Sequence, residues 1–226
     1  MRIGILGSGT VGRTLATKLA EEHEVSIGTR DPDALAARTE PDAMGNPPFP
    51  DWHRSHPRVQ VGRFADAARH GELLVNATSG AGSVDALATA DPADLEQKVL
   101  IDVSNPLRWS PDEPPSLLVA NTDSLAEQIQ RAFPALRVVK SLNTVTAAVM
   151  VDPSRVGDGR HLAFVCGNDE DAKRTVTRVL TERLGWRDVV DLGDLTAARA
   201  TEAYLLLWLR LMQTVGDPMF NITLAR

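Results

Sequence analysis

Three glycines near the start of the 226-residue chain, Gly7, Gly9 and Gly12, form the pattern Gly-x-Gly-x-x-Gly. In such a loop the first glycine allows a tight turn, and the second lets a pyrophosphate approach the backbone. The third lets a helix pack closely on a strand. Free N–H groups at the start of the helix then bind the phosphates. The pattern alone is weak, but here it follows a short apolar run and opens an amphipathic segment, which favours a dinucleotide site.

The choice of nicotinamide cofactor depends on the residues that end the second predicted strand, where the chain has Thr29 and Arg30. NAD sites place an acidic residue there, which accepts a hydrogen bond from the ribose 2′-hydroxyl. A threonine and an arginine suit a 2′-phosphate, since a guanidinium binds phosphate through two donors. Asp31 and Asp33 follow and are the NAD alternative, but Asp31 before Pro32 is typical of a helix N-cap. The sequence favours NADP.

Polar loops follow three later apolar runs, at residues 76–82, 104–106 and 141–144. Ligands of open parallel sheets bind at the carboxyl ends of the strands. We therefore expect these loops to frame the nicotinamide side of the site.

General acid, nucleophile and metal motifs are not evident. The five histidines have no metal-ligand or triad spacing, and Gly80-Ala81-Gly82-Ser83 lacks the register of a hydrolase elbow. Cys166 lies within an apolar run and is expected to be an inert core thiol. Lys140 is the nearest candidate proton donor, although a lysine at a strand end is more often structural. We expect neither a catalytic side chain nor a bound metal.

Apolar runs of strand length alternate with helical patterns along the chain, which indicates an α/β fold with a doubly wound parallel sheet of the Rossmann type. Residues 1–145 are expected to form the NADP-binding domain. Residues 146–226 are expected to form a short α/β C-terminal extension that completes the acceptor site and forms the dimer interface.

Three local features accompany this pattern. Residues 40–58 contain five prolines and predict a long structured loop or lid. Asn168 is expected to cap a helix whose first turn is acidic. The segment 203–212 is apolar except for Arg210, which predicts a helix in the core or at a subunit interface.

The composition limits the class of protein. A single cysteine excludes a disulfide framework, and a net charge of −6 argues against nucleic acid as the main partner. The chain has no apolar stretch of about 18 residues that would span a membrane, and its first residues do not form a signal peptide pattern. We expect a cytoplasmic protein without a membrane partner.

Several motifs together resemble the NADPH-dependent reductases of coenzyme F420, an 8-hydroxy-5-deazaflavin. The resemblance covers nearly the whole chain, and the spacing between the Leu-Asn-Thr and Val-Cys-Gly-Asn-Asp segments is its most particular part. It rests on residues 7–12, 28–30, 104–107, 138–144, 165–170 and 191–193.

The resemblance implies a dimeric Rossmann-type subunit that passes hydride directly between NADP and F420. It implies that Ser8, Gly9, Thr10 and Val11 hold the pyrophosphate, and that Thr29 and Arg30 hold the 2′-phosphate. It places Leu207 against the deazaflavin. The residues that it places on the nicotinamide side are Thr78, Gly82, Ser104, Pro106 and Ser141.

Three other activities remain open. An NADPH-dependent reductase of an ordinary flavin or of a ferric complex uses a related scaffold. A carbonyl or imine reductase needs a proton donor and a larger helical domain than the last 80 or so residues provide. A non-catalytic NADP sensor would bind NADPH without turnover.

Overall fold

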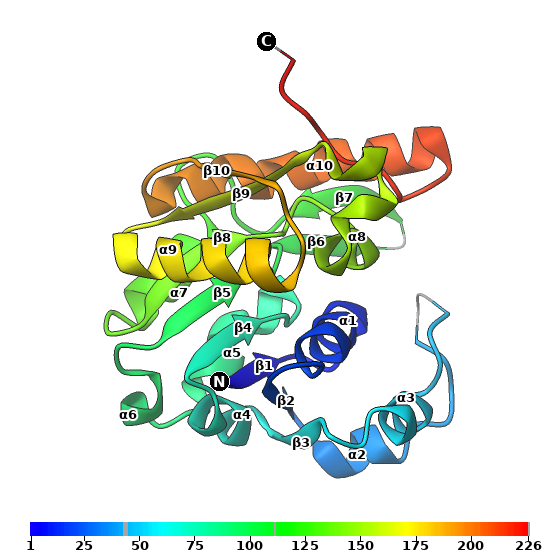
Figure 1. Cartoon of the computed structure of the whole chain (residues 1–226), viewed down its shortest axis with the longest axis vertical. Coiled ribbons are helices and arrows are strands. Elements are labelled where there is room, and N and C mark those ends of the chain that lie inside the picture. Colours follow the sequence, from blue (N-terminus) through cyan, green and yellow to red (C-terminus); the bar gives the residue numbers. More distant parts are fainter. Residues whose placement is uncertain (43–44, 111, 226) are drawn as a thin grey trace.

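The main element of the fold is a sheet of eight strands. The structure is a computed structural model and describes residues 1–42, 45–110 and 112–225. Figure 1 shows the strands stacked in the order β10-β9-β8-β5-β4-β1-β2-β3. Their bounds are β1 (Arg2–Leu6), β2 (Glu24–Thr29), β3 (Gln60–Arg63), β4 (Leu73–Asn76), β5 (Val99–Asp102), β8 (Arg137–Ser141), β9 (Leu162–Gly167) and β10 (Asp188–Asp191).

Six neighbouring strands, in the sheet order β8-β5-β4-β1-β2-β3, pair in parallel and follow the Rossmann order. The expected α/β fold with a doubly wound sheet is therefore confirmed. Strands β6 (Leu107–Ser110) and β7 (Glu113–Leu117) form a separate antiparallel hairpin.

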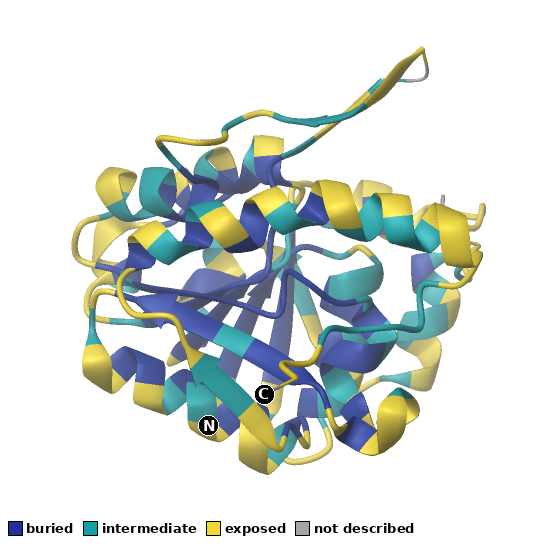
Figure 2. Cartoon of the chain, turned by 90° about the horizontal axis from the view of Figure 1, so that it is seen from above, coloured by how far each residue is buried: buried dark blue, intermediate teal, exposed yellow. Residues whose placement is uncertain are grey.

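Helices cover both faces of the sheet, and the strand side chains alternate between two cores. Ile3 and Ile5 of β1 belong to one core, whereas Leu6 belongs to the other. This alternation follows from the two-residue period of a strand and explains why apolar runs without polar interruptions form these strands. Figure 2 shows the buried strands between partly exposed helices.

One core contains buried residues of α1 (Thr10–Leu19), α8 (Ala147–Val151) and α9 (Glu170–Arg178). The other contains buried residues of α4 (Phe64–His70), α5 (Ser83–Ala88) and α7 (Leu125–Ala132). The remaining helical segments are α2 (Pro32–Ala36), α3 (Phe49–Ser55), α6 (Pro92–Leu95), α10 (Ala198–Val215), the 3₁₀ turns η1 (Gly80–Gly82), η2 (Pro153–Arg155), η3 (Gly157–Gly159) and η5 (Leu195–Ala197), and the π turn η4 (Val179–Arg183).

The C-terminal extension adds β9 and β10 to the edge of the same sheet, and β9 runs antiparallel to β8. The predicted parallel sheet thus contains one antiparallel pair, β8 with β9. Residues 142–161 contain the five-residue helix α8 and two 3₁₀ turns, without a helix long enough to cross back along the sheet. The chain therefore re-enters the sheet at the same end of the strands at which it left β8.

Two local expectations need correction. The predicted loop at 40–58 contains helix α3, whose aromatic side chain Phe49 is buried in the core; residues 43 and 44 of that range lie outside the described residues. Helix α9 is capped by Asp169, which accepts a hydrogen bond from Ala172 N, and not by Asn168. The amide oxygen of Asn168 instead accepts from Leu195 N, so a tertiary contact moved the cap by one residue.

Helix α10 is more exposed than a core helix. Leu206 and Leu207 are 41% and 54% exposed, while Leu205 and Glu202 face inward. Of the two expectations for this segment, the core placement is wrong and the subunit interface stays a prediction. No helix among the described residues is both long and apolar enough to cross a membrane.

Cys166 of β9 is 1% exposed, and burial raises the pKa of its thiol to about 12. We expect the native protein not to react with a disulfide reagent such as DTNB at pH 8, because the thiolate is the reactive form. One thiol should become reactive in denaturant. Rapid labelling of the folded protein, followed by absorbance, would contradict this placement.

Candidate functional site

A cleft of about 700 Å³ opens at the carboxyl end of the sheet between β1 and β4. This is the point where the strand order reverses, and open α/β sheets bind ligands there. The cleft brings together seven of the predicted residues: Gly7, Ser8, Gly9, Thr29, Arg30, Thr78 and Gly82.

The glycine loop has the geometry that its spacing predicts. Gly7 has a φ of +122°, and a Cβ there would lie 2.3 Å from the carbonyl oxygen of Ala77. A Cβ on Gly12 would lie 1.9 Å from the oxygen of Gly7, so this glycine allows α1 to pack against the turn. Gly9, the N-cap of α1, faces open space. The loop therefore leaves room for a phosphate at the positive end of the helix.

Three arginines surround the far end of the cleft. Arg30 follows β2, Arg38 follows α2, and Arg63 ends β3; all three are exposed and line the cleft beside the buried Thr29. Parallel pairing of β2 with β3 places Thr29 directly opposite Arg63. Such a cluster of guanidinium groups with one hydroxyl is suited to a phosphate monoester.

Asp31, the acidic residue that an NAD site would use, instead caps a helix. Its carboxylate accepts hydrogen bonds from Asp33 N and Ala34 N and caps α2. The expectation that Asp31 begins a helix with Pro32 is confirmed. The acidic side chain is thereby held on the helix that follows β2.

A polar cluster ties the proline-rich segment to the start of α1. The guanidinium of Arg13, buried on α1, contacts the Asp42 carboxylate and donates to Pro47 O at 2.7 Å. Asn46 Nδ2 donates to Thr10 Oγ1 at 2.9 Å, and Thr10 donates to Asp42. Residues 37–42 and 47–49 consequently line a second cavity of about 380 Å³ together with Ser8 and Gly9.

The remaining predicted residues do not line this cleft. Thr10, Val11 and Gly12 form the first turn of α1 behind the loop. Ser104 and Pro106 lie buried in the loop after β5, and the Ser141 hydroxyl at the end of β8 donates to Phe164 O. A Cβ on Gly80 would collide with Asn105 O at 2.1 Å, so the loops after β4 and β5 are in direct contact.

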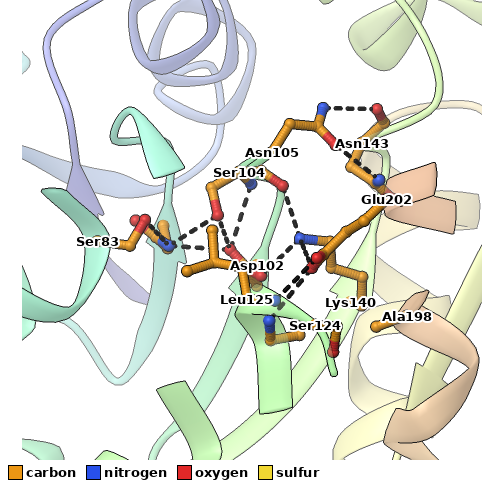
Figure 3. A network of polar contacts seen from close by, with 12 residues as sticks. Ser83, Asp102, Ser104, Asn105, Ser124, Leu125, Lys140, Asn143, Ala198 and Glu202 are labelled. Carbon is orange, nitrogen blue, oxygen red and sulfur yellow. Dashed lines mark hydrogen bonds and ion pairs between the residues drawn. The ribbon is translucent and has the colours of Figure 1, made fainter. Parts of the chain in front are cut away.

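A buried ionic network lies beneath these loops (Figure 3). Lys140 Nζ contacts Asp102 Oδ2 at 2.8 Å and Glu202 Oε1 at 2.9 Å, and it donates to Ser104 O at 2.6 Å. Burial alone would lower the pKa of Lys140, but the two carboxylates raise it above its ordinary value. Lys140 therefore stays charged and is structural, as its position at a strand end indicates. It is not placed as a proton donor.

Among the described residues, no group of three or more His, Cys, Asp or Glu is arranged to hold a metal ion. Two of the five histidines, His53 and His56, belong to an aromatic cluster around Trp52 of α3.

The family "NADP oxidoreductase coenzyme F420-dependent" matches residues 2–106, the glycine loop and the first five sheet strands. A crystal structure from Arthrobacter sp. FB24, described as a candidate F420-dependent NADP-reductase, is 51% identical, with full coverage of both chains and a TM-score of 0.95. The chain belongs to this family.

Two further relatives of this chain have lower sequence identity. The F420-dependent NADP reductase of Methanocaldococcus jannaschii is 28% identical over 90% of this chain and 88% of its own length. The rat Metalloreductase STEAP3 is 30% identical over 89% of this chain, and the match spans 36% of that relative's length. NADP-linked oxidoreduction is the chemistry of the family.

Sequence reasoning missed two of the three cleft arginines in this oxidoreductase. Arg63 ends a four-residue strand with a single large apolar residue, Val61, so no pattern announced a strand there. Arg38 lies beyond α2 in a polar stretch that any surface loop could contain. No local sequence pattern marks either residue as part of the cleft.

Two alanine substitutions separate the packing role of the glycine loop from its open face. Gly12→Ala should destabilise the protein by about 1–3 kcal/mol, because the added methyl group overlaps the Gly7 carbonyl. Gly9→Ala should leave stability nearly unchanged, since Gly9 has a φ of −76° and open space around its Cβ position. Urea unfolding of both variants measures this difference. Equal stabilities would refute the close approach of α1 to the turn.

Proposed function

We propose that this chain transfers a hydride between NADP(H) and coenzyme F420. The observation that carries the NADP assignment is the cluster of Thr29 with three arginines at one end of a cleft that begins at the glycine loop. Family membership supports F420 as the second substrate.

The adenosine end of NADP is held by charge and by hydroxyl groups. In this proposal the guanidinium groups of Arg30, Arg38 and Arg63 bind the 2′-phosphate, and Thr29 donates a hydrogen bond to it. The pyrophosphate binds over Gly9 at the N-terminus of α1, flanked by Ser8, Thr10 and Val11. Residues 37–42 and 47–49, which Arg13 holds against α1 through Asp42 and Pro47, line a cavity beside this position.

The nicotinamide end rests on the loops after β4, β5 and β8. Thr78, Gly82, Ser104, Pro106 and Ser141 form this side of the site in the proposal. When bound, the nicotinamide supplies the hydride and the deazaflavin accepts it, so the cofactors carry the chemistry. The residues of the chain bind and orient the two rings and exclude water, and none acts as a nucleophile.

The C-terminal extension completes the acceptor side. The exposed leucines of α10, among them Leu207, form an apolar surface suited to a deazaflavin ring or to a second subunit. We include in the proposal a homodimer in which residues 146–226 supply both the acceptor side and the interface.

A metal or flavin reductase is the second candidate. The similarity to Metalloreductase STEAP3 favours it, because the matched region covers nearly all of this chain. Both candidates share the NADPH half of the site and differ in the acceptor.

Substitution of the cleft arginines should weaken the binding of NADPH but not that of NADH. Arg30→Ala, Arg38→Ala and Arg63→Ala should each weaken NADPH binding by up to about 1.5–3 kcal/mol, the range for a charged hydrogen bond, with little change for NADH. Arg54→Ala is the matched control, since Arg54 is exposed on α3 and pairs with Asp51. Calorimetric titration provides the affinities, and an equal loss for NADPH and NADH would remove these arginines from the 2′-phosphate site.

A panel of acceptors tests the second substrate. With NADPH as donor, we expect stopped-flow traces to show faster reduction of F420 than of FMN, FAD or ferric citrate. A direct hydride transfer should also carry the label from NADPH deuterated at C4 into the reduced deazaflavin. Faster reduction of a flavin or of ferric iron would favour the second candidate, and NADPH binding without turnover on any acceptor would indicate a sensor.

A further inference from the structure

Helix α10 is connected to the cofactor loops by a buried network in which Lys140 is the central group. The side chains of Lys140 and Asp102 have no exposed surface, and that of Glu202 is 2% exposed. One ammonium thus lies between two carboxylates that belong to distant parts of the chain. Figure 3 shows these three side chains converging from β8, β5 and α10.

On its outer side the network fixes α10. Besides its contact with Lys140, the Glu202 carboxylate accepts hydrogen bonds from Leu125 N at 2.8 Å and Ala126 N at 3.2 Å. These N–H groups lie in the first turn of α7 and have no partner within that helix. Glu202 therefore sets the position of α10 against both α7 and β8.

On its inner side the network fixes the loops of the cleft. Asp102 Oδ1 accepts from Ser104 Oγ at 2.6 Å and from Asn76 Nδ2 at 2.9 Å. Asn76 Oδ1 in turn accepts from the hydroxyl of Thr78, a cleft residue, at 2.7 Å. An unbroken series of contacts thus joins Glu202 to Thr78.

A second connection runs parallel to the first. Asn143 Nδ2 donates to Asn105 Oδ1 at 3.0 Å and to Thr201 O at 2.9 Å, while Asn105 Nδ2 donates to Asn143 O. The first turn of α10 contacts Asn143 in the loop after β8, and Asn143 contacts Asn105 in the loop after β5. The 2′-phosphate cluster, at the ends of β2 and β3, takes part in neither connection.

The physical properties of the network favour a role in geometry. A buried ion pair contributes little net stability, because desolvation of the charges offsets their attraction. A fully satisfied buried network does, however, restrict its members to one arrangement. Small displacements of reacting groups reduce rates of transfer strongly, so such a restriction matters most beside the reacting ring.

We propose that Glu202 and Lys140 are positioning residues that set the nicotinamide-side loops relative to α10, an inference that rests on the proposed function. They act through Ser104, Asn76 and Thr78 on the nicotinamide half of NADPH and leave the adenosine half unaffected. The network thereby fixes the distance between α10, on the acceptor side, and the loops on the nicotinamide side.

Glu202→Gln is the decisive variant, because it preserves the shape of the side chain and leaves Lys140 and Asp102 as a neutral pair. Glu127→Gln is its matched control. Glu127 also joins α7 to α10, through Arg199 at 2.5 Å, but its contacts with Arg199 and Ser124 lie outside the network. A loss of helix docking alone should affect both variants alike.

Three measurements on each variant separate positioning from folding: the dissociation constant of 2′,5′-ADP, the fluorescence of bound NADPH, and the rate of hydride transfer to F420 in a single turnover. For Glu202→Gln we expect 2′,5′-ADP affinity within about twofold of wild type, an altered emission of bound NADPH and a rate at least about tenfold lower. Glu127→Gln should retain the wild-type emission and rate. Lys140→Arg, which keeps the charge but displaces it, should behave like Glu202→Gln and serves in its place if that variant does not fold.

Wild-type emission and rate in both Glu202→Gln and Lys140→Arg would overturn the inference, as would an equal loss in Glu127→Gln. The fluorescence comparison does not require the correct acceptor, so it stands even if F420 is inactive. Failure of 2′,5′-ADP to compete with NADPH on the wild-type protein would instead contradict the proposed function.

Discussion

Parallel pairing of β1 with both β2 and β4 is the constraint on which the site depends. Because parallel strands end at the same edge, the glycine loop, the Thr29–Arg30 corner and the loop at Thr78 must meet there. This pairing in turn requires that the loop occupy little space, since Gly7 and Gly12 lie against backbone atoms. Larger side chains at these two positions would separate α1 from the sheet and move the helix terminus out of the cleft.

The parts of the structure that the sequence predicted are those specified by local pattern. The strands at 2–6 and 73–76 are buried on both faces and therefore appear as apolar runs. Capping is equally local: Asp31 caps α2, as its position before Pro32 predicts. Such features depend on neighbours within four residues, and the sequence contains those neighbours directly.

The parts that were missed depend on tertiary contacts. Asn168 and Asp169 are both good N-cap residues; Asp169 caps α9, whereas the Asn168 side chain accepts a hydrogen bond from Leu195 N, 27 residues away. The antiparallel direction of β9 depends on how the chain returns from α8, which no periodicity encodes. Arg38 and Arg63 join the cleft because the chain returns to the same edge twice after β2. The proposed phosphate site consists of exposed side chains on separate segments, so it leaves no compact motif.

The two ends of the cleft differ in how they are built, and this difference corresponds to different demands. Binding of a 2′-phosphate requires positive charge in roughly the right place, and exposed arginines with long side chains can adapt to it. A ring that exchanges hydride requires a fixed position, which flexible surface side chains cannot provide. The groups beneath that end are accordingly short, buried and hydrogen-bonded, from Ser104 and Asn76 to Asp102. Affinity and geometry can therefore change separately in this fold, because the arginine cluster and the Lys140 network share no hydrogen bond among the described residues.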